Sequence, residues 1–549
     1  MRQSLKKLLY ILPVSGMLAL SSCEKKIDEA FTNPNAAVVQ PIETLLPGVI
    51  ANMVVSASAN GSFYGTQRDG SYLGKWIQNF VTNSTGNRQD QMSDFYGTTT
   101  PDLQGDIWAM HYYGHGQNIE RIIQWGTEQE KWDYVGVAKA IRAWGWLTLT
   151  DVTDDVILHE AFNPSQLTFN YNTQEEVYEK VKELSYEALN YLSRTDGNVS
   201  QANLNKGDAY FNQGDVNKWK KFVYGVLART FHRTTNKGAA YQADSVLKYV
   251  NLAAQDNSEN SMISWSRDGG SGTYSWFSVF RANLGTWRQS RFIAELMSGQ
   301  NDQFPTGEID PRAIYIIREN SVGTFRGARP NKGADATLIP AAELPQNFYG
   351  GAFSSTTGSN SSARYIFRNE ARWPIITAYE MKFIKAEALY RKGFISDARD
   401  AYVQALNLHF DHLIAEYEVN VPGTKVITPA QRAAFFANPI NVPPVASFSL
   451  SHIMLQKYIA MYGWGVIETW VDMRRYHYID LDPLTGQQVY REFTLPAPGV
   501  DLYSGNSGLP AYRQRPRYNS EYLYNQAELS RLGAFANDYI TKEMWFSKP

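Results

Sequence analysis

The chain contains a single cysteine, and this residue limits how a protein of 549 residues can be held together. Cys23 ends a short apolar run that follows the basic residues Arg2, Lys6 and Lys7. A basic segment followed by an apolar run of about 13 residues is typical of a signal peptide, and the run is shorter than the roughly 20 residues of a spanning helix. We therefore predict that residues 1–22 are a lipoprotein signal peptide and that Cys23 becomes the mature N-terminus.

The residues before the cysteine indicate how it is used. Leu20-Ser21-Ser22-Cys23 resembles a bacterial lipobox, whose cysteine is acylated, for example with palmitate, after cleavage. Two or more acyl chains give lasting membrane attachment, whereas one does not. The alternative is an ordinary secretory signal with an incidental cysteine. If Cys23 carries lipid, no cysteine remains for a disulfide, so the fold has to be stabilised by packing.

Charge and length narrow the classes of function and fold. The 52 basic and 54 acidic residues nearly balance and form no long block of like charge, which argues against nucleic acid as a partner. The mature chain of about 527 residues is long enough for two domains or for one large helical array. Aromatic residues make up 13% of the chain. Tyr and Trp suit a helix-packed core, and they suit stacking on sugars or on peptide side chains equally well.

Apolar residues recur at helical spacing in two parts of the chain, which predicts a helical frame over about 106–255 and 374–480. Thr173 and Glu176 form a capping-box pattern, and Asp215 is placed to cap a further helix. The helices that we expect cover about 43–60, 106–124, 131–150, 173–192, 217–235, 240–254 and 450–476.

Residues 376–408 contain a repeat that predicts how these helices pair. Gly393, Ala398, Tyr402 and Ala405 have offsets of 0, 5, 9 and 12, and Ala386 lies seven residues before the glycine. These are tetratricopeptide spacings, in which small residues let paired helices approach closely and the tyrosine fills the gap to the next pair. Together with the earlier helix pairs, they predict a degenerate array of about four repeats.

Two stretches rich in Gly, Ser, Asn and aromatic residues, about 61–105 and 256–370, predict loops that face a ligand. In such loops, aromatic rings can stack on sugar faces while Asn, Asp and Arg bond to hydroxyl groups. The candidate ligand-binding residues are Asp69, Tyr72, Trp76, Asn83, Asp90, Trp276, Trp287, Arg288, Tyr349 and Arg364.

The sequence favours no catalytic or cofactor site. Gly114-His115-Gly116 lacks the third glycine of a dinucleotide fingerprint, and Gly269–Gly272 is followed by Thr273 where a nucleophile elbow needs glycine. The pairs His111/His115 and His409/His412 lack the glutamate of a zinc-protease helix, so we expect no metal site.

Three nearby aspartates leave more than one interpretation open. Asp151, Asp154 and Asp155 could bind calcium or act as acid and base, but we expect them to end the preceding helix and hold the turn after it. A glycosidase pair elsewhere also stays possible, because only the separation of two carboxylates in space identifies one.

Several short motifs in a fixed order resemble one known family. The first motif is Asn33-Pro34-Asn35, which follows the lipobox. The second has the pattern RAW…TD..GDVP..EA and is matched by Arg142-Ala143-Trp144, Thr150-Asp151, Asp155-Val156 and Glu160-Ala161. In this second motif, Asp154 replaces the glycine and Ile157 replaces the proline. Three later motifs also match: Trp373–Thr377; then Gln456–Ala460 with Glu468, Trp470 and Arg474-Arg475; and finally Pro516-Arg517-Tyr518 with Glu521. In the last of these, Asn519 replaces a proline. The chain thus resembles the SusD/RagB-type outer-membrane lipoproteins of Bacteroidetes, in the branch with the Asn-Pro-Asn motif.

This resemblance implies a mostly α fold, in which tetratricopeptide-like helix pairs form a right-handed frame with a long loop-rich insertion, as a single domain over residues 23–549. It implies a lipid-anchored protein on the outer face of the outer membrane that captures oligosaccharide. It also implies a TonB-dependent (SusC/RagA-like) transporter as partner, with this protein as the hinged lid, and neither catalysis nor a cofactor. Oligopeptide cargo is the main alternative, and a surface glycosidase is a further one. The signature residues Arg142, Asp151, Glu468 and Arg475 are expected to hold helix ends and buried pairs.

Overall fold

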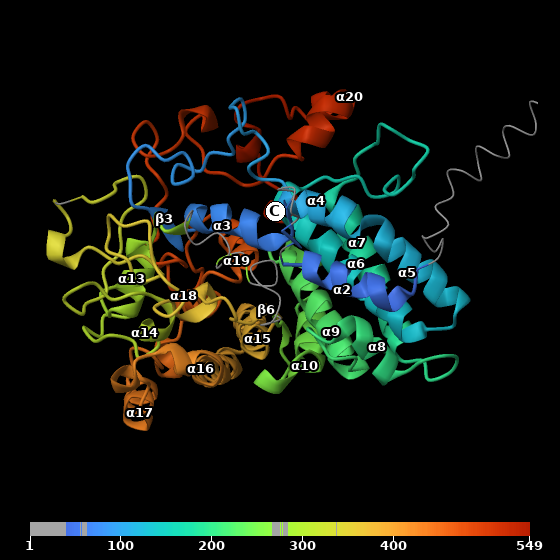
Figure 1. Cartoon of the computed structure of the whole chain (residues 1–549). Coiled ribbons are helices and arrows are strands. Elements are labelled where there is room, and N and C mark those ends of the chain that lie inside the picture. Colours follow the sequence, from blue (N-terminus) through green and yellow to red (C-terminus); the bar gives the residue numbers. More distant parts are fainter. Residues whose placement is uncertain are drawn as a thin grey trace, which may run out of the picture.

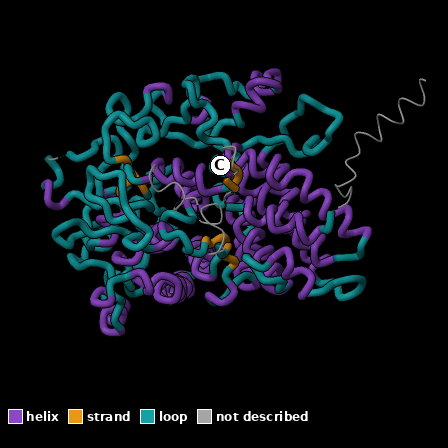
Figure 2. Tube along the Cα trace, in the orientation of Figure 1, coloured by secondary structure: helices purple, strands orange, loops and turns teal. Residues whose placement is uncertain are grey.

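The computed structural model describes residues 40–54, 56–57, 63–265, 275, 277, 284–335 and 337–549. The predicted signal peptide, Cys23, Asn33-Pro34-Asn35 and Trp276 lie outside these residues. The described chain is built mainly of helices and loops with three short two-stranded sheets, which confirms the mostly α prediction (Figure 2).

One half of the molecule is the helical frame, seen on the right of Figure 1. Its central helix is α6, Trp132–Thr153, which is buried along nearly its whole length because α5, α7 and α9 pack around it. The frame consists of α2 (Ile42–Asn52), α5 (Gly116–Glu128), α6, α7 (Gln174–Leu192), α8 (Gln201–Asp208), α9 (Val216–Arg233) and α10 (Ala243–Leu252).

The predicted helix starts are confirmed by their capping bonds. The Thr173 side chain accepts from the backbone N–H of Glu176, and the Glu176 side chain accepts from the N–H of Thr173, so both bonds of the capping box form. Asp215 accepts from the backbone N–H groups of Asn217 and Lys218 at 2.8 and 3.3 Å. These bonds satisfy N–H groups that have no partner within the first turn of a helix.

The helix pair predicted from the tetratricopeptide spacing forms α15 (Ala378–Arg391) and α16 (Ile395–Tyr417), which pack side by side. Gly393 makes the turn between them with a φ of 81°, a left-handed conformation that glycine adopts without strain. Ala386, Ala398 and Ala405 are fully buried. The buried Tyr402 donates its hydroxyl proton to the carbonyl oxygen of Asn441, at 2.7 Å, in the next segment.

The predicted helix over 450–476 is two helices in the structure, α18 (Leu450–Ala460) and α19 (Val466–Arg475). The break falls at Gly463, which has a φ of 77° and donates its N–H to the side-chain oxygen of Asn79 at 2.9 Å. The long-range bond and the positive φ together end the first helix.

Two other predicted helices differ in extent. The segment expected as one helix over 106–124 is α4 (Asp106–Ala109), a π-helix over Met110–His115 and then α5. The helix expected over 43–60 ends at Asn52, whose side chain donates to the carbonyl oxygen of Gly114 in the π-helix at 3.1 Å.

The loop-rich half holds the two stretches predicted to face a ligand, and it fills the left and top of Figure 1. In this half, β3 pairs antiparallel with β5, in the register Val81↔Arg288. The other sheets are β1 with β2 and β4 with β6. The elements are β1 (Ser56–Ala57), β2 (Phe63–Tyr64), α3 (Thr66–Trp76), β3 (Phe80–Thr82), β4 (Ser261–Ile263), β5 (Trp287–Gln289), α13 (Arg291–Met297), α14 (Ala313–Ile316), β6 (Trp373–Ile376), α17 (Pro429–Ala437) and α20 (Gln526–Arg531).

Two groups of buried ion pairs involve the frame helices α6 and α9 and the later helices α15 and α19. Arg233 of α9 pairs with Asp151 of α6 at 2.8 Å and with Glu468 of α19 at 2.5 Å. Arg475 of α19 pairs with Glu387 of α15 at 2.6 Å. Burial raises the pKa of Glu387, but the neighbouring Arg475 and His232 outweigh it and hold that pKa well below its ordinary value.

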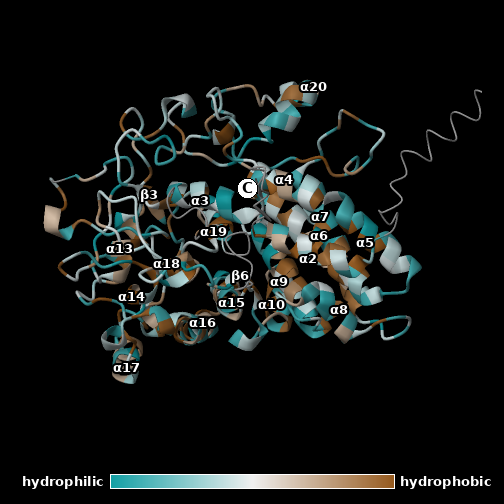
Figure 3. Ribbon diagram, viewed as in Figure 1, coloured by the Kyte–Doolittle hydropathy of each residue, from teal (hydrophilic) through white to brown (hydrophobic). Residues whose placement is uncertain are grey.

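These contacts confirm the structural role expected for the signature residues. Arg142 is buried as well, pairs with Glu120 at 2.8 Å and donates to the carbonyl oxygen of Gly116 at 3.0 Å. Figure 3 shows hydrophobic stretches, in brown, beside hydrophilic ones, in teal, along the frame helices. Within the described ranges, no helix is long and apolar enough to span a membrane.

Candidate functional site

The two loop-rich stretches meet at the β3–β5 pair, whose strands are more than 200 residues apart in sequence. The side-chain nitrogen of Asn83, directly after β3, donates to the carbonyl oxygen of Phe353 at 3.1 Å. Arg288 of β5 is fully buried, and its guanidinium donates to the carbonyl oxygens of Gly285, Ala352 and Ser355 at 2.7, 3.1 and 2.9 Å and to that of Phe353. One strand pair thus fixes the 352–355 loop from both sides.

Asp90 and Trp287 lie in the same cluster. The Asp90 carboxylate accepts from the backbone N–H of Thr82 at 3.0 Å and from that of Asn331 at 3.2 Å. The Trp287 ring lies 5.1 Å from the Phe80 ring, and the ammonium of Lys75 lies 4.6 Å from the Trp287 centroid. Both predicted residues are buried and serve the packing of the loops.

The remaining predicted residues lie elsewhere. Asp69 is buried and accepts from the N–H groups of Gly105 and Ile107, and Trp76 packs in the core with its ring 5.4 Å from that of Trp470. Tyr349 is buried and donates to the carbonyl oxygen of Phe277, while Arg364 pairs with Glu319 at 2.7 Å. Tyr72 is half-buried, with its ring 6.4 Å from that of Phe95.

Among the nine described candidates, only Tyr72 and Asn83 keep a substantial part of the side chain exposed. The others hold loops in place, as their hydrogen bonds and ring contacts show. Direct ligand contact by any of the ten residues stays a prediction.

A cavity lies between α13 and the loops at 325–339, and we call it the arginine pocket. Its volume is about 310 Å³, which lies at the lower end of the range for small-molecule sites. Its walls come from α13 and from the loops at 325–339, all within or next to the predicted ligand-facing insertion. The residues that define its character are Arg291, Arg326, Arg329, Phe325, Leu338 and Ile339.

Each arginine of the pocket is paired with a carboxylate. Arg291 contacts Glu295 at 2.6 Å, Arg326 contacts Glu343 at 2.8 Å, and Arg329 contacts Asp335 at 3.2 Å. The three guanidinium groups stay partly exposed, at 53, 41 and 38% of the side chain. The pairs cancel in charge yet leave N–H donors and carboxylate lone pairs open to solvent, which suits a neutral ligand rich in hydroxyl groups.

The sequence did not single out these three arginines. Arg291 begins the short helix α13, and Arg326 and Arg329 lie in a loop without periodicity. The convergence of α13 with the 325–339 loop is a tertiary feature that no local pattern reveals.

Among the other groups considered as chemical sites, Asp154 has structural partners. Asp154 ends α6, accepts from the backbone N–H of Trp545 at 3.2 Å and pairs with Arg513 at 2.9 Å, which agrees with the predicted helix-ending role. The aspartate next to it, Asp155, has its pKa raised to about 6 by burial and by the charge of Asp154. His111 and His115 are fully buried. In the part of the chain that the structure describes, no three His, Cys, Asp or Glu side chains are grouped to hold a metal ion.

The architecture is that of a helical scaffold with a cavity between α13 and the loops of its loop-rich half. A family model described as "Starch-binding associating with outer membrane" matches residues 35–495. The chain therefore belongs to this SusD-like family of nutrient-binding, outer-membrane-associated proteins. The match confirms the resemblance to SusD-type proteins drawn from the sequence motifs.

Solved structures share the fold over nearly the whole chain. A SusD/RagB family protein from Bacteroides thetaiotaomicron is 21% identical, with 93% of this chain and 99% of that one covered and a TM-score of 0.64. A SusD homolog from Bacteroides fragilis is 17% identical, with 92% and 100% covered and a TM-score of 0.66. A chitin-binding SusD homolog from Flavobacterium johnsoniae is 17% identical, with 92% and 98% covered and a TM-score of 0.62. No curated protein matched the sequence.

Proposed function

We propose that this protein captures an oligosaccharide at the cell surface and passes it to a TonB-dependent (SusC/RagA-like) outer-membrane transporter, for which it acts as a hinged lid. The observation that carries the binding role is the arginine pocket, a cavity with three charge-balanced arginine–carboxylate pairs on a rigid loop scaffold. Family membership supports glycan as the ligand class.

The chemistry of the pocket favours a neutral glycan over an acidic one. An anion would have to compete with the carboxylates already bonded to each guanidinium. A sugar hydroxyl both donates and accepts, so it can bridge an open guanidinium N–H and a neighbouring carboxylate oxygen without breaking the pair. The apolar wall formed by Phe325 and Ile339, which are 5 and 9% exposed, offers a surface for a ring face.

Isothermal titration against neutral oligosaccharides of glucose and of N-acetylglucosamine tests this proposal. Arg326→Gln removes the charge and reduces the donors at the pocket, and we expect it to weaken binding at least about tenfold, as the loss of charge-assisted bonds predicts. Arg531→Gln is the matched control, because Arg531 also pairs with a carboxylate, Glu528, at 2.7 Å and is 54% exposed, but lies on α20. Equal loss in both variants, or in neither, would contradict the assignment of the pocket.

Tryptophan substitutions are less suitable for this test. Trp76 and Trp287 are 1 and 4% exposed, so Trp→Ala at either position would cost about 3–5 kcal/mol of folding free energy and would impair binding through the fold.

Peptide cargo is the second candidate, because guanidinium groups also bind peptide carboxylates in a bidentate manner. Mass spectrometry of the purified protein distinguishes the two: co-purified peptides, with no heat from any glycan, would favour it. A surface glycosidase would instead shorten the oligosaccharide, and we expect intact substrate after long incubation.

The anchor and the partner have their own tests. We propose that lipid on Cys23 holds the body next to the transporter at the cell surface. Added protease should degrade the protein on whole cells, a Cys23→Ser variant should leave the membrane fraction, and the wild type should co-purify with an outer-membrane barrel. A wild-type protein that resists protease on intact cells would contradict surface exposure.

A further inference from the structure

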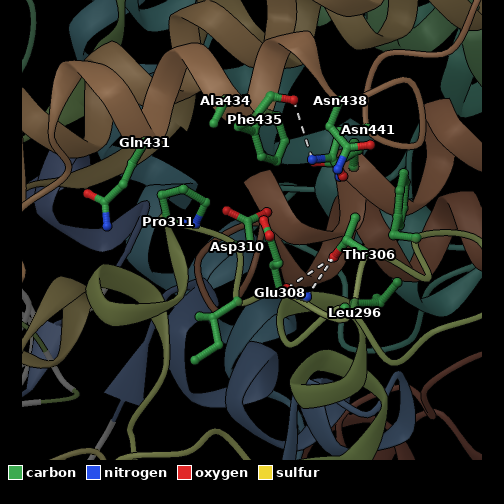
Figure 4. Close-up of a pocket in the computed structure, with 14 residues that line it drawn as sticks. Leu296, Thr306, Glu308, Asp310, Pro311, Gln431, Ala434, Phe435, Asn438 and Asn441 are labelled. Carbon is green, nitrogen blue, oxygen red and sulfur yellow. Dashed lines mark hydrogen bonds between the residues drawn. The ribbon is translucent and has the colours of Figure 1, made fainter.

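A second cavity, which we call the amide pocket, lies between α17 and the loop over 306–311 (Figure 4). Its volume is about 200 Å³, below the roughly 300 Å³ at which drug-sized sites begin, so it fits one small unit of a larger ligand. It borders the far end of α13, where Leu296 and Gly299 contribute to its wall, whereas Arg291 at the start of α13 lines the arginine pocket.

Four carboxamide side chains line the amide pocket, and each has bonding capacity left over. Gln456 is 1% exposed; its oxygen accepts from the guanidinium of Arg312 at 2.6 Å, while its nitrogen has no acceptor among the described residues. The side-chain oxygen of Asn438 accepts from the N–H of Ile440, and that of Gln431 accepts from the N–H of Thr428. Within the described ranges, the side-chain nitrogens of Asn438 and Gln431 also donate to no acceptor. Asn441 donates to the carbonyl oxygen of Phe435 at 3.4 Å and keeps its own oxygen open.

The charges of the pocket disfavour an acidic ligand. The Asp310 carboxylate is held by Arg312 at 2.6 Å, so that pair is neutral. Glu308 is exposed and, among the residues that the structure describes, has no cation within ion-pair distance. The pocket therefore carries one uncompensated negative charge and several free amide donors. An uncharged group with its own hydroxyl or amide functions matches this surface, and an anion does not.

Apolar side chains supply the remaining wall. Phe304 and Phe435 are 2 and 5% exposed and lie under the polar rim, and Figure 4 shows Phe435 on α17 beside Asn438 and Asn441. A sugar ring fits such a cavity, because its apolar face can lie on the phenylalanine rings while its hydroxyl groups bond to the amides and the carboxylate.

We propose that the amide pocket is a second carbohydrate site, which takes one neutral sugar unit independently of the arginine pocket. The choice of sugar as ligand rests on the proposed function, whereas the existence of a site rests on the free carboxamides. Two sites on one chain would raise the avidity for a long glycan beyond the affinity of either site alone.

A blocking substitution tests this proposal without disturbing the core. Ala434 lines the amide pocket and is exposed on α17, so Ala434→Trp should fill the cavity. Its neighbour Ala433 is also exposed but does not line the pocket, which makes Ala433→Trp the matched control. Both substitutions are made in the Arg326→Gln variant, in which the arginine pocket is impaired. The probes are maltose, N,N′-diacetylchitobiose and the anion glucuronate, and their binding is observed by saturation-transfer NMR.

We expect at least one neutral probe to bind the Arg326→Gln variant and glucuronate to give no signal. Adding Ala434→Trp should reduce the signal of the neutral probe at least fivefold, and adding Ala433→Trp should leave it unchanged. The second site is refuted if Arg326→Gln alone abolishes all sugar binding, or if Ala434→Trp has no effect in that background. The proposed function stands in both cases, because the wild type still binds. It fails separately if the wild type binds no neutral glycan, and that outcome overturns the second site as well.

Discussion

At the scale of single residues, most of the predicted ligand-binding side chains are buried and bond to other parts of the protein. Arg288 shows this most clearly, because its guanidinium is fully buried and bonds to backbone carbonyls, with no carboxylate partner among the described residues. Burial lowers the pKa of Arg288 to about 10. A cation without a counter-ion in such a place is tolerated only because several carbonyl dipoles replace its water.

We predict that Arg288→Met loosens the 352–355 loop, because three or more carbonyl oxygens lose their donor at once. Thermal unfolding should show a lower Tm, and limited proteolysis should cut this loop faster than in the wild type. Arg531→Met removes an exposed, ion-paired arginine and should change neither. An unchanged cleavage rate in Arg288→Met would mean that the loop is held by other contacts.

At the scale of elements, the helical frame depends on close approach at glycine. A Cβ added to Gly225 of α9 would lie 2.7 Å from a side-chain carbon of Ile376 in β6, whereas one added to Gly48 of α2 would meet nothing within 4 Å. Both glycines lie inside helices at ordinary φ, so they differ only in their surroundings.

We predict opposite effects for the two alanine variants. Gly225→Ala should lower the free energy of unfolding by about 1–3 kcal/mol, because the crowded side chain has to shift. Gly48→Ala should leave it unchanged or raise it by up to about 1 kcal/mol, because alanine favours the helix. Urea denaturation followed by circular dichroism measures both, and a similar loss in each would contradict close packing of α9 on β6.

His477, directly after α19, is one of the residues that link this segment to the C-terminal part of the chain. Nδ1 of His477 lies 2.6 Å from the Asp480 carboxylate, and Nε2 lies 2.9 Å from that of Glu543. The hydrogen bond to Asp480, followed by the one to Glu543, raises the pKa of His477 from 6.5 to about 9, although partial burial of the ring lowers it.

This pKa shift predicts a pH dependence of stability. A pKa raised in the folded state stabilises the fold fully below pH 6.5, and that contribution is lost as the pH rises toward about 9. The Tm of the wild type should therefore fall across this window more than that of His477→Gln, which has no titrating ring. Parallel Tm curves for the two proteins would show that His477 titrates normally.

At the scale of the whole molecule, local sequence patterns predicted the helical half much better than the loop half. Capping residues such as Thr173 and Asp215 act within one turn, and the spacing from Ala386 to Ala405 reports a packing rule, so both are visible in sequence. The break at Gly463 was missed because it depends on a bond to Asn79, far away in the chain.

The loop-rich half was predictable only in outline, for a physical reason. Composition located the loops, but aromatic and charged residues in loops serve packing and ligand binding equally well, and Trp76 and Arg288 turned out to be buried. Arg326 and Arg329 became candidates only when the structure placed them beside α13. Site residues that come together through tertiary contacts need coordinates to be found.

The crystal structure of the protein with the oligosaccharide that binds most tightly in the titrations tests the central claim most directly. We predict electron density for sugar rings in the arginine pocket, with hydroxyl groups within hydrogen-bond distance of Arg326 and of the carboxylate of Asp335 or Glu295. Sugar bound elsewhere on the molecule, with the three arginine–carboxylate pairs unchanged and free of ligand, would contradict it.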